Sequence, residues 1–406
     1  MSVPKLRFME FDLPYKLTSL DDALIDYSLG GNYANSYDVT SNALIKMGNL
    51  GRGYINAEKV EYIQNNERIT DDHKLEIGDL LFNTRNTLDL VGKVAIWRGE
   101  LERAYFNSNI MRMVFDNNYY MNYALNTKKS LTKLKAIASG TTSVAAIYTK
   151  DLKKIKIWIP SINEQTKIAD FLSSVDDKIT LLNKQYDLLC QYKKGMMQKI
   201  FSQELRFKDD SGRAFPEWKS TILDEVVDLI TNGLALDQND SKNGYPVSRI
   251  ETISEHCINM NKVGFVNTDN DISNYKLNYG DMLFSNINSI SHIGKIAYFN
   301  IDDTLYHGMN LLRIVIKNSH CKLFFYYQLT TDTNKKYFES RANQAVSQAS
   351  INQTELRKTP VQVPCQEEQT KIASFLSALD NKIAVKKAEL DKLKTWKQGL
   401  LQQMFV

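Results

Sequence analysis

Residues 160–201 read PSINEQTKIADFLSSVDDKITLLNKQYDLLCQYKKGMMQKIF, and residues 364–405 read PCQEEQTKIASFLSALDNKIAVKKAELDKLKTWKQGLLQQMF. The two stretches align without a gap, and 19 of their 42 positions are identical. Self-similarity of this strength at a fixed offset indicates an internal duplication. The chain is therefore expected to consist of two related units, each ending in this stretch.

Each copy has the pattern of one long helix. Its apolar residues recur at steps of four and three, and no proline interrupts them, which is typical of a heptad seam. The seam residues are Ile168, Leu172, Val175, Ile179, Leu182 and Leu189 in the first copy and Ile372, Leu376, Leu379, Ile383, Leu390 and Leu393 in the second. A helix of about 40 residues would span roughly 60 Å. The length favours an intramolecular antiparallel coiled coil, although a helix pair in the core of an ordinary domain also fits the pattern.

The first residues of each copy predict how the helix begins. Ser161 stands three residues before Glu164, the spacing of a capping box in which each side chain satisfies a backbone N–H of the other. The second copy keeps Glu368 but has Cys365 in the serine position, which predicts a weaker cap.

Lysines interrupt the apolar seam. Lys193 and Lys397 occupy the same seam position in the two copies, and Lys386 interrupts the second copy once more. A lysine at such a position costs stability and helps to fix the register of a coiled coil.

The segments before the two helices repeat more loosely. The clearest echoes are Leu6-Arg7-Phe8 against Leu205-Arg206-Phe207, and Gly78-Asp79-Leu80-Leu81-Phe82 against Gly280-Asp281-Met282-Leu283-Phe284. Gly-Asp before a short apolar run predicts a turn that leads into a buried strand. Short helical stretches are expected at Ser19–Tyr27 and Thr221–Thr231.

The predicted fold is therefore α+β, with mixed α/β globular domains and two long helices in a pseudo-twofold repeat. The expected segments are a first globular domain at 1–159, a first coiled-coil helix at 160–204, a second globular domain at 205–363 and a second helix at 364–406.

The composition excludes several classes of protein. The chain of 406 residues has a net charge of +4 and 43% hydrophobic residues, so it is not a strongly basic nucleic-acid-binding tail. It has no apolar run long enough to span a membrane and no signal-peptide pattern at its start. Its four cysteines show no CxxC spacing and suit a reducing compartment. We expect a cytoplasmic protein with no membrane association.

No catalytic or cofactor motif is found. Gly92-Lys93 and Gly294-Lys295 lack the remaining residues of a phosphate-binding loop, and Gly48-x-x-Gly51-x-Gly53 has the wrong order for a dinucleotide fingerprint. The five histidines have no metal-ligand spacing. We expect a chain without catalytic residues, cofactor or metal.

Polar, amide-rich and basic loops recur at matching places in both halves. Asn and Gln pair with adenine, and Arg and Lys with guanine, in the major groove of DNA. For any single residue, the favoured interpretation is still that of an ordinary solvated loop position. The candidate DNA-binding residues are Lys46, Arg85, Asn86, Lys93, Thr141 and Ser143 in the first half, and Arg249, Asn286, Asn288, His292, Lys295, Gln344 and Gln348 in the second.

The order of globular domain, heptad helix, globular domain and heptad helix resembles the DNA-specificity subunit of type I restriction–modification enzymes. The helix openings Pro-x-x-x-Glu-Gln-x-Lys-Ile-Ala-x-Phe-Leu, the stretch from Leu205 to Trp218 and the segment from Ser347 to Ile351 are similar to that family. The resemblance covers essentially the whole chain.

This resemblance implies that each globular domain is a target recognition domain for one half of a split, asymmetric site in double-stranded DNA. It further implies that the helices set the spacing between half-sites and dock two methyltransferase subunits. Those subunits would carry S-adenosylmethionine and methylate adenine N6, and a translocating nuclease subunit would join them in the restricting complex. The chain itself would supply specificity and no catalysis. The alternative is a coiled-coil scaffold, or an orphan copy, that lacks sequence-specific DNA recognition.

Overall fold

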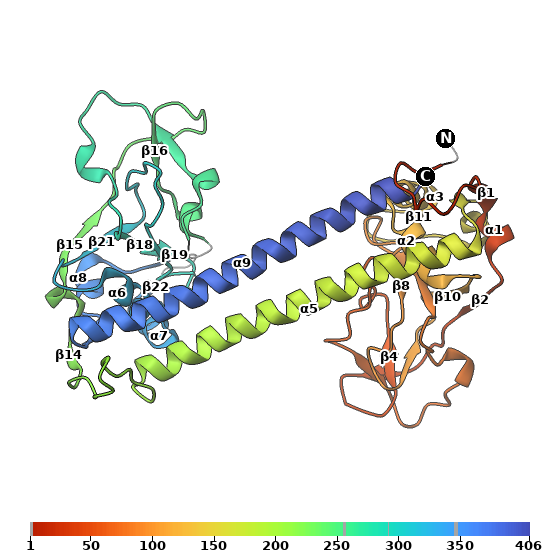
Figure 1. Ribbon diagram of the computed structural model, residues 1–406, viewed down its shortest axis with the longest axis horizontal. Coiled ribbons are helices and arrows are strands. Elements are labelled where there is room, and N and C mark those ends of the chain that lie inside the picture. Colours follow the sequence, from red (N-terminus) through yellow and green to blue (C-terminus); the bar gives the residue numbers. More distant parts are fainter. Residues whose placement is uncertain (1–2, 255–256, 291, 345–347) are drawn as a thin grey trace. The chain divides into compact units, whose positions relative to one another are not determined.

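The computed structural model describes residues 3–254, 257–290, 292–344 and 348–406 (Figure 1). The chain forms two compact units. Unit 1 consists of residues 1–183 and 388–406, and unit 2 consists of residues 184–387. Each long helix is thus divided between the two units, whereas the sequence suggested separate helical segments. The two units are described in turn.

Unit 1 is a mixed α/β domain of short strands. Its main sheet is antiparallel, in the order β2-β10-β6-β8, and a second sheet has the order β3-β5-β4-β9. A small sheet, β11-β12-β7, and the pair β1-β13 complete it. The strands are β1 (Lys16–Ser19), β2 (Asp26–Leu29), β3 (Asn35–Ser36), β4 (Ala43–Ile45), β5 (Glu61–Ile63), β6 (Leu80–Asn83), β7 (Arg85–Asn86), β8 (Val94–Ile96), β9 (Ala104–Phe106), β10 (Ile110–Val114), β11 (Ser139–Gly140), β12 (Ala145–Ala146) and β13 (Lys156–Ile159). The short helices are α1 (Leu20–Ala23), α2 (Asn118–Leu125), α3 (Lys128–Ile137) and α4 (Thr149–Leu152).

Unit 2 repeats this plan. Its main sheet, β15-β21-β18-β20, matches the main sheet of unit 1, and β19-β23-β22 and β14-β24 match the small sheet and the pair. The second sheet of unit 1 is replaced in unit 2 by the two-stranded sheet β16-β17, which occupies the same position along the chain. The strands are β14 (Lys219–Ile222), β15 (Val227–Asn232), β16 (Tyr245–Val247), β17 (Gly264–Val266), β18 (Met282–Phe284), β19 (Ile287–Asn288), β20 (Ile296–Tyr298), β21 (Leu312–Ile316), β22 (Asn343–Gln344), β23 (Ala349–Ser350) and β24 (Pro360–Val363). The short helices are α6 (Lys322–Leu329), α7 (Asp332–Arg341) and α8 (Gln353–Arg357).

The Gly-Asp echo in the sequence marks the same turn in both units. Gly78 and Gly280 have φ angles of +97° and +93°, a conformation that favours glycine. In unit 2 the following Asp281 is buried, accepts a backbone hydrogen bond from Asn278 at 2.7 Å and pairs with Arg313 of β21 at 2.6 Å. The predicted turn into a buried strand is confirmed, and the aspartate also ties that turn to the neighbouring strand.

The helical prediction for Ser19–Tyr27 and Thr221–Thr231 is wrong. The first range contains only the four-residue α1, followed by β2, and the second contains a short 3-10 helix, Leu223–Glu225, followed by β15. In both places the backbone pairs with a strand far along the chain, β10 or β21, and this pairing overrides the local preference.

The two long helices are α5 (Ile162–Phe201) and α9 (Gln366–Met404). In unit 1 the first half of α5 packs against the last half of α9, with Phe171 and Trp396 in edge contact at 6.1 Å. In unit 2 the last half of α5 packs against the first half of α9, where Lys387 lies over the ring of Tyr186 at 5.7 Å. Opposite halves therefore meet in each unit, and the antiparallel coiled coil is confirmed.

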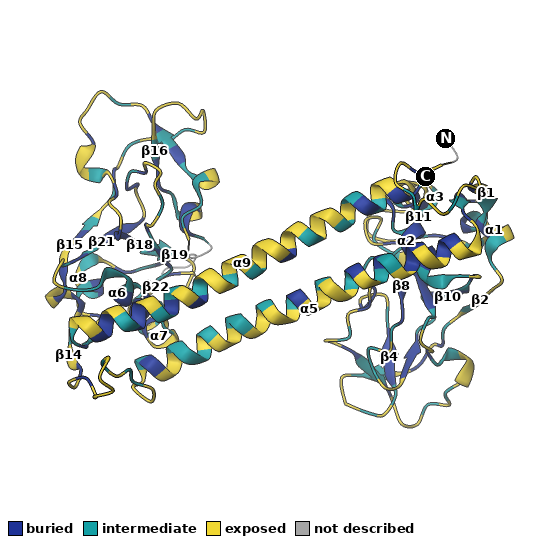
Figure 2. Ribbon diagram, in the orientation of Figure 1, coloured by how far each residue is buried: buried dark blue, intermediate teal, exposed yellow. Residues whose placement is uncertain are grey.

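Seam residues are buried in the first turns of both long helices and again at Leu182 and Leu390, while exposed residues cover the outer faces of the helices (Figure 2). Buried are Ile168, Leu172, Val175, Leu182, Ile372, Leu376, Leu379 and Leu390, and half-buried are Ile179, Leu189, Ile383 and Leu393. In unit 1 the first three belong to the same apolar cluster as Phe82 of β6. The seam thus serves the core of the globular domain as well as the helix pair, a second role that the heptad pattern does not reveal.

Two matched triads contain the seam lysines. In unit 2, Lys193 Nζ pairs with Asp380 Oδ1 of α9 at 2.5 Å, and the hydroxyl of Tyr327 on α6 donates to Asp380 Oδ2 at 2.7 Å. In unit 1, Lys397 pairs with Asp176 of α5, and the hydroxyl of Tyr123 on α2 donates to Asp176 at 2.8 Å. Each triad joins both long helices and one globular domain. The half-buried Lys386 lies outside the two triads.

A buried glutamate anchors the start of each long helix. Glu164 is 1% exposed, and its two carboxylate oxygens accept hydrogen bonds from Arg7 at 2.8 and 2.7 Å and from the Tyr15 hydroxyl at 3.1 Å. This carboxylate raises the pKa of Arg7, and burial followed by the same charge raises the pKa of Tyr15.

Unit 2 has the same arrangement, in which a buried glutamate is held by an arginine and an aromatic side chain; we call this arrangement the clasp. There Glu368 accepts from Arg206 at 3.2 and 2.8 Å and from the Trp218 indole at 2.9 Å. The capping-box prediction is therefore wrong: in the described structure, Glu164 makes no hydrogen bond to the backbone of Ser161 and is directed at a segment 157 residues away. The Leu-Arg-Phe echo in the sequence is explained by the arginines of these two clasps.

The described part of the chain includes no helix that combines the length and the apolarity needed to cross a bilayer.

Replacing Glu164 with glutamine should destabilise unit 1 by about 3 kcal/mol, because the largely buried ion pair would be broken and the Arg7 guanidinium would lose its counter-charge. Glu10→Gln is the matched control: Glu10 pairs with Lys167 at 3.4 Å, but both side chains are about half exposed, so the cost should be below about 1 kcal/mol. Urea unfolding followed by tryptophan fluorescence measures both variants. Equal costs would show that the clasp does not anchor the helix.

The triads should show energetic coupling between the helices. A double-mutant cycle of Lys397→Met and Asp176→Asn should give a coupling energy of about 1–2 kcal/mol, because the two groups are in contact and partly buried. The control cycle pairs Lys394→Met with Asn183→Ala, whose exposed hydrogen bond of 3.3 Å should give a coupling near zero. Similar coupling in both cycles would contradict a register-fixing role for the seam lysine.

Candidate nucleic-acid interface

The small sheet of unit 1 gathers four of the six candidates in that half. Arg85 and Asn86 form β7, which pairs with β12, while Thr141 and Ser143 lie in the loop that joins β11 to β12. Their hydroxyls are 3.1 Å apart, and the Thr141 hydroxyl accepts from the backbone N–H of Val144, so the loop has a defined turn. Arg85 is exposed, and no partner of its guanidinium is recorded within the described residues.

The matching sheet of unit 2 carries different side chains. Asn288 lies on β19, where its amide donates to Ser285 Oγ at 3.2 Å. Gln344 belongs to β22, but the placement of its side chain lies outside what the structure describes. Gln348 is exposed directly before β23. The two small sheets thus occupy equivalent places while presenting different chemical groups.

Two of the predicted cations are already engaged within the protein. Lys46 pairs with Glu61 at 3.0 Å and also donates to Asn35. Arg249 donates to Gln238 at 2.8 Å and to Asp240 at 2.7 Å. Both lie apart from the small sheets, after β4 and β16 respectively, and their contacts give each a structural role in its own loop.

The remaining candidates border the small sheets. Lys295 donates to the Ser254 carbonyl at 2.8 Å, and His292 Nδ1 lies 2.9 Å from the Ser289 hydroxyl in the turn after β19. Asn286 holds a buried side-chain oxygen for which no partner is recorded within the described residues. Lys93, just before β8, is half-buried, and burial followed by the charge of Arg52 lowers its pKa.

Arg52 itself was not among the predicted residues. It lies in the Gly51-x-Gly53 stretch, whose glycines do not fit a dinucleotide fingerprint. The two glycines signalled a tight turn, and a basic residue at the corner of such a turn is the feature that would have identified it.

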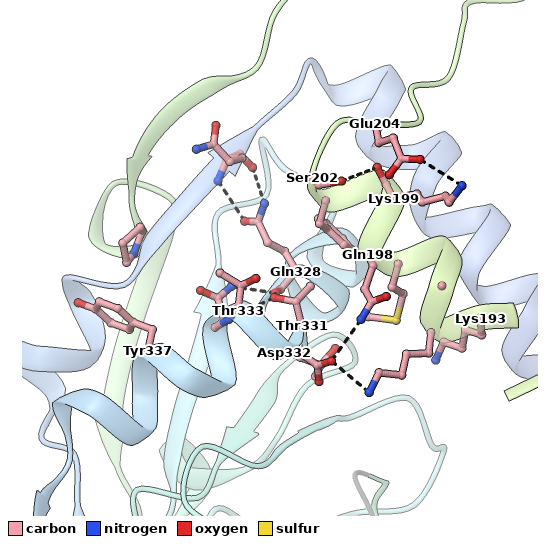
Figure 3. Close-up of a pocket in the computed structure, with 18 of the residues that line it drawn as sticks. Lys193, Gln198, Lys199, Ser202, Glu204, Gln328, Thr331, Asp332, Thr333 and Tyr337 are labelled. Atoms are coloured by element: carbon pink, nitrogen blue, oxygen red, sulfur yellow. Dashed lines mark hydrogen bonds and ion pairs between the residues drawn. The ribbon is translucent and has the colours of Figure 1, made fainter. Parts of the chain in front are cut away.

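Unit 2 contains a groove of about 890 Å³ beside the last turns of α5 and the first turn of α7 (Figure 3). Its charged side chains are engaged with one another: Lys194 pairs with Asp332 at 3.1 Å, and Lys199 pairs with Glu204 at 3.1 Å. Gln198 also reaches Asp332, at 3.5 Å. The groove therefore combines paired charges with apolar side chains such as Met197, Phe201 and Tyr337.

His307 has a structural role. His307 is fully buried, its Nε2 hydrogen-bonds the Leu311 carbonyl at 3.0 Å, and burial lowers its pKa to about 4, so it stays neutral. The residues that the structure describes include no cluster of three or more His, Cys, Asp or Glu side chains able to hold a metal ion.

A known protein family shares this two-repeat architecture. A family model described as the type I restriction modification DNA specificity domain matches residues 29–190 and 216–395, one match for each repeat. The chain belongs to this family. The resemblance drawn from the helix motifs is therefore confirmed.

Curated relatives carry the same description. The chain is 40% identical over 210 residues to a provisionally named type I restriction enzyme MjaX specificity subunit of Methanocaldococcus jannaschii, a match to 50% of this chain and about half (49%) of that relative. It is 27% identical over 357 residues to the MjaVIII specificity subunit of the same organism, covering 85% of this chain and 81% of that relative.

Solved structures of the family share the fold. The S subunit of a type I restriction–modification system from M. genitalium superimposes with a TM-score of 0.65 at 17% identity, covering 100% of this chain and 99% of that one. A chain from a structure of type I R-M complex assembly gives 0.52 at 16% identity, with coverage of 97% and 98%.

Arg85 and Arg249 should differ in their importance for folding. Arg85→Ala should change the free energy of unfolding by less than about 0.5 kcal/mol, because the side chain is exposed. Arg249→Ala should cost about 1–2 kcal/mol, because it removes the partner of Gln238 and of the Asn239 carbonyl. Thermal unfolding of the two variants makes the comparison, and a larger cost for Arg85 would contradict it.

Proposed function

We propose that this chain is the specificity subunit that reads a two-part, asymmetric sequence in double-stranded DNA. In this role it directs adenine-N6 methylation, and restriction, by methyltransferase and nuclease subunits that bind to it. The observation that carries the proposal is the presence of two equivalent small sheets with non-equivalent side chains, one in each unit of a chain that belongs to the specificity family.

The chemistry of these sheets suits base recognition. Arg85 and Asn86 of β7 correspond in the sheet to Ile287 and Asn288 of β19. An arginine pairs with guanine through two hydrogen bonds, whereas an isoleucine contacts the methyl group of thymine. Two readers that differ in this way would recognise different half-sites, so the complete site would be asymmetric.

The long helices offer a surface for the partner subunits. On α5, Leu181 and Leu188 are 58% and 54% exposed at heptad spacing, although leucines at this spacing normally pack against another helix. On α9, Val385 is 66% exposed. These three apolar side chains lie outside the seam, and we assign them to methyltransferase docking. The groove of Figure 3, beside the end of α5, is a second candidate surface for the same partners.

Catalysis would lie in the partners. S-adenosylmethionine would be bound by the methyltransferase subunits, which would flip the target adenine out of the duplex, as enzymes that modify bases do. In the proposed complex this chain positions the DNA and holds the two methyltransferases.

The test is a genome-wide map of N6-methyladenine in cells that express the methyltransferase subunit with the wild-type chain, without it, or with Arg85→Ala. The wild-type chain should produce methylation at one split, asymmetric motif that disappears without it. Arg85→Ala should relax the sequence requirement at one half-site and leave the other half unchanged, since it removes one reader only. Lys16→Ala, an exposed change on the separate pair β1-β13, is the control and should preserve the motif.

A stable complex that produces no chain-dependent motif would contradict the proposal. The chain would then be a scaffold without sequence-specific recognition.

A further inference from the structure

A glycine-flanked turn in unit 1 presents Arg52. The backbone N–H of Gly51 donates to the Tyr54 carbonyl at 2.9 Å, and Leu50 and Ile55 form a bridge behind the turn. Gly53 has a φ of +88°, which only glycine adopts readily. The sequence Gly-Arg-Gly-Tyr therefore closes a tight turn with the arginine at its corner.

This turn lies beside Lys93. Gly53 N–H donates to the Val94 carbonyl at 2.7 Å, so Arg52 and Lys93 flank the same backbone contact at the start of β8. Burial lowers the pKa of both side chains, and the charge of Arg52 lowers the pKa of Lys93 further. Two cations are thus held close together and partly out of water.

The neighbourhood compensates this positive charge only in part, because burial lowers the pKa of Arg52 more than the charge of Asp89 raises it. Arg52 Nη2 donates to the Asp89 backbone carbonyl at 3.0 Å, but Nη1 is buried with no partner recorded within the described residues. The Asp89 carboxylate is 88% exposed and pairs with Lys135 at 2.9 Å. Desolvated cations with open donors are costly unless an anion reaches them.

We infer that Arg52 and Lys93 form a binding site for a phosphodiester group of the DNA backbone. This inference rests on the proposed function and extends it, because it assigns a sequence-independent contact to residues next to the base-reading sheet. Arg52 contacts the Asp89 carbonyl in the connection that follows β7, and the Lys93 carbonyl accepts from the N–H of Asn83, two residues before β7, so both residues border that strand. Phosphate contacts of this kind position a protein on DNA without reading its sequence.

The two units differ at this place. In unit 2, the lysine at the equivalent position is Lys295, and its ammonium donates to the Ser254 carbonyl. Among the described residues of unit 1, by contrast, no hydrogen-bond partner is recorded for the ammonium of Lys93. The contact with the DNA backbone is therefore expected in unit 1 and not in unit 2.

The test measures binding of the full-length chain to a mixed-sequence duplex of about 30 base pairs over a range of salt concentrations. Each phosphate contact contributes about 0.9 to the slope of log K against log salt. The double variant Arg52→Gln/Lys93→Gln should bind more weakly and lower the slope by about 1–2. The control variant, Lys16→Gln/Lys156→Gln, removes two exposed cations from the pair β1-β13 and should leave the slope unchanged.

Further measurements separate the possible outcomes. Thermal unfolding shows whether the double variant is folded, and Arg52→Lys, which keeps the charge, should retain most of the slope. In the complex with the methyltransferase subunits, the variant should keep the methylated motif of the wild type, because the contact does not read bases.

Several results would overturn the inference. Equal slopes for the wild type and the double variant would do so while leaving the proposed function intact, as would an equal loss in the control variant. Stabilisation of the wild type by inorganic phosphate, with an unchanged duplex slope, would identify a free-anion site instead. Absence of duplex binding by the wild-type chain would overturn this inference, while the proposed function would still be decided by the methylation map of the complex.

Discussion

The buried glutamate at the start of each long helix is the interaction on which each unit depends. Removing a carboxylate from water costs free energy, and the Glu164 side chain is only 1% exposed. The bidentate contact with Arg7 and the hydrogen bond from the Tyr15 hydroxyl offset this cost. A buried ion pair adds little net stability compared with an apolar pair, but it penalises every arrangement in which one partner is missing. Its value here is geometric: it fixes which residue of the N-terminal segment meets the first turn of α5. The clasp recurs at Glu368 with tryptophan in place of tyrosine. The constant feature of the two repeats is therefore the glutamate–arginine pair, whereas the aromatic partner differs.

The seam triads extend this control along the helices. A heptad seam of aliphatic residues alone permits slippage by one heptad with little change in burial, because each leucine finds another leucine. A lysine in the seam removes that freedom, since a shifted register would leave its charge opposite apolar side chains. Lys193 finds Asp380 on the opposite helix in one register, and Tyr327 then links the same aspartate to α6. Helix register and domain attachment are thus set by one carboxylate in each unit.

The sequence predicted the repeat, the long helices and the antiparallel pairing because these depend on periodicity, which a single chain displays directly. It failed where the deciding partner is distant. Ser161 and Glu164 have capping-box spacing, but the partner of Glu164 is Arg7, and no local pattern distinguishes the two roles. Likewise, Lys46 and Arg249 align between the repeats and are both basic, yet Glu61 and Asp240 already engage them. Arg85, Asn86, Thr141 and Ser143 were chosen as separate loop residues, and only the pairing of β7 with β12 shows that they share one surface. Arg52 is not predicted from the sequence, because two glycines alone do not distinguish a cofactor loop from a tight turn that presents a cation.

The division of labour within unit 1 has a physical rationale. Base recognition needs side chains whose hydrogen-bonding groups are open and whose replacement leaves the fold intact, which suits the short strands and the loop of the small sheet. A contact with the DNA backbone needs a positive charge at a fixed position, and a tight turn or a strand end holds a cation in such a position. If both tasks fell to the same residues, any change of specificity would also weaken DNA binding. Placing Arg52 and Lys93 beside the small sheet, on separate backbone supports, separates the two tasks. The reading surface can then change in sequence while the grip on the duplex and the ion pairs at the helices remain.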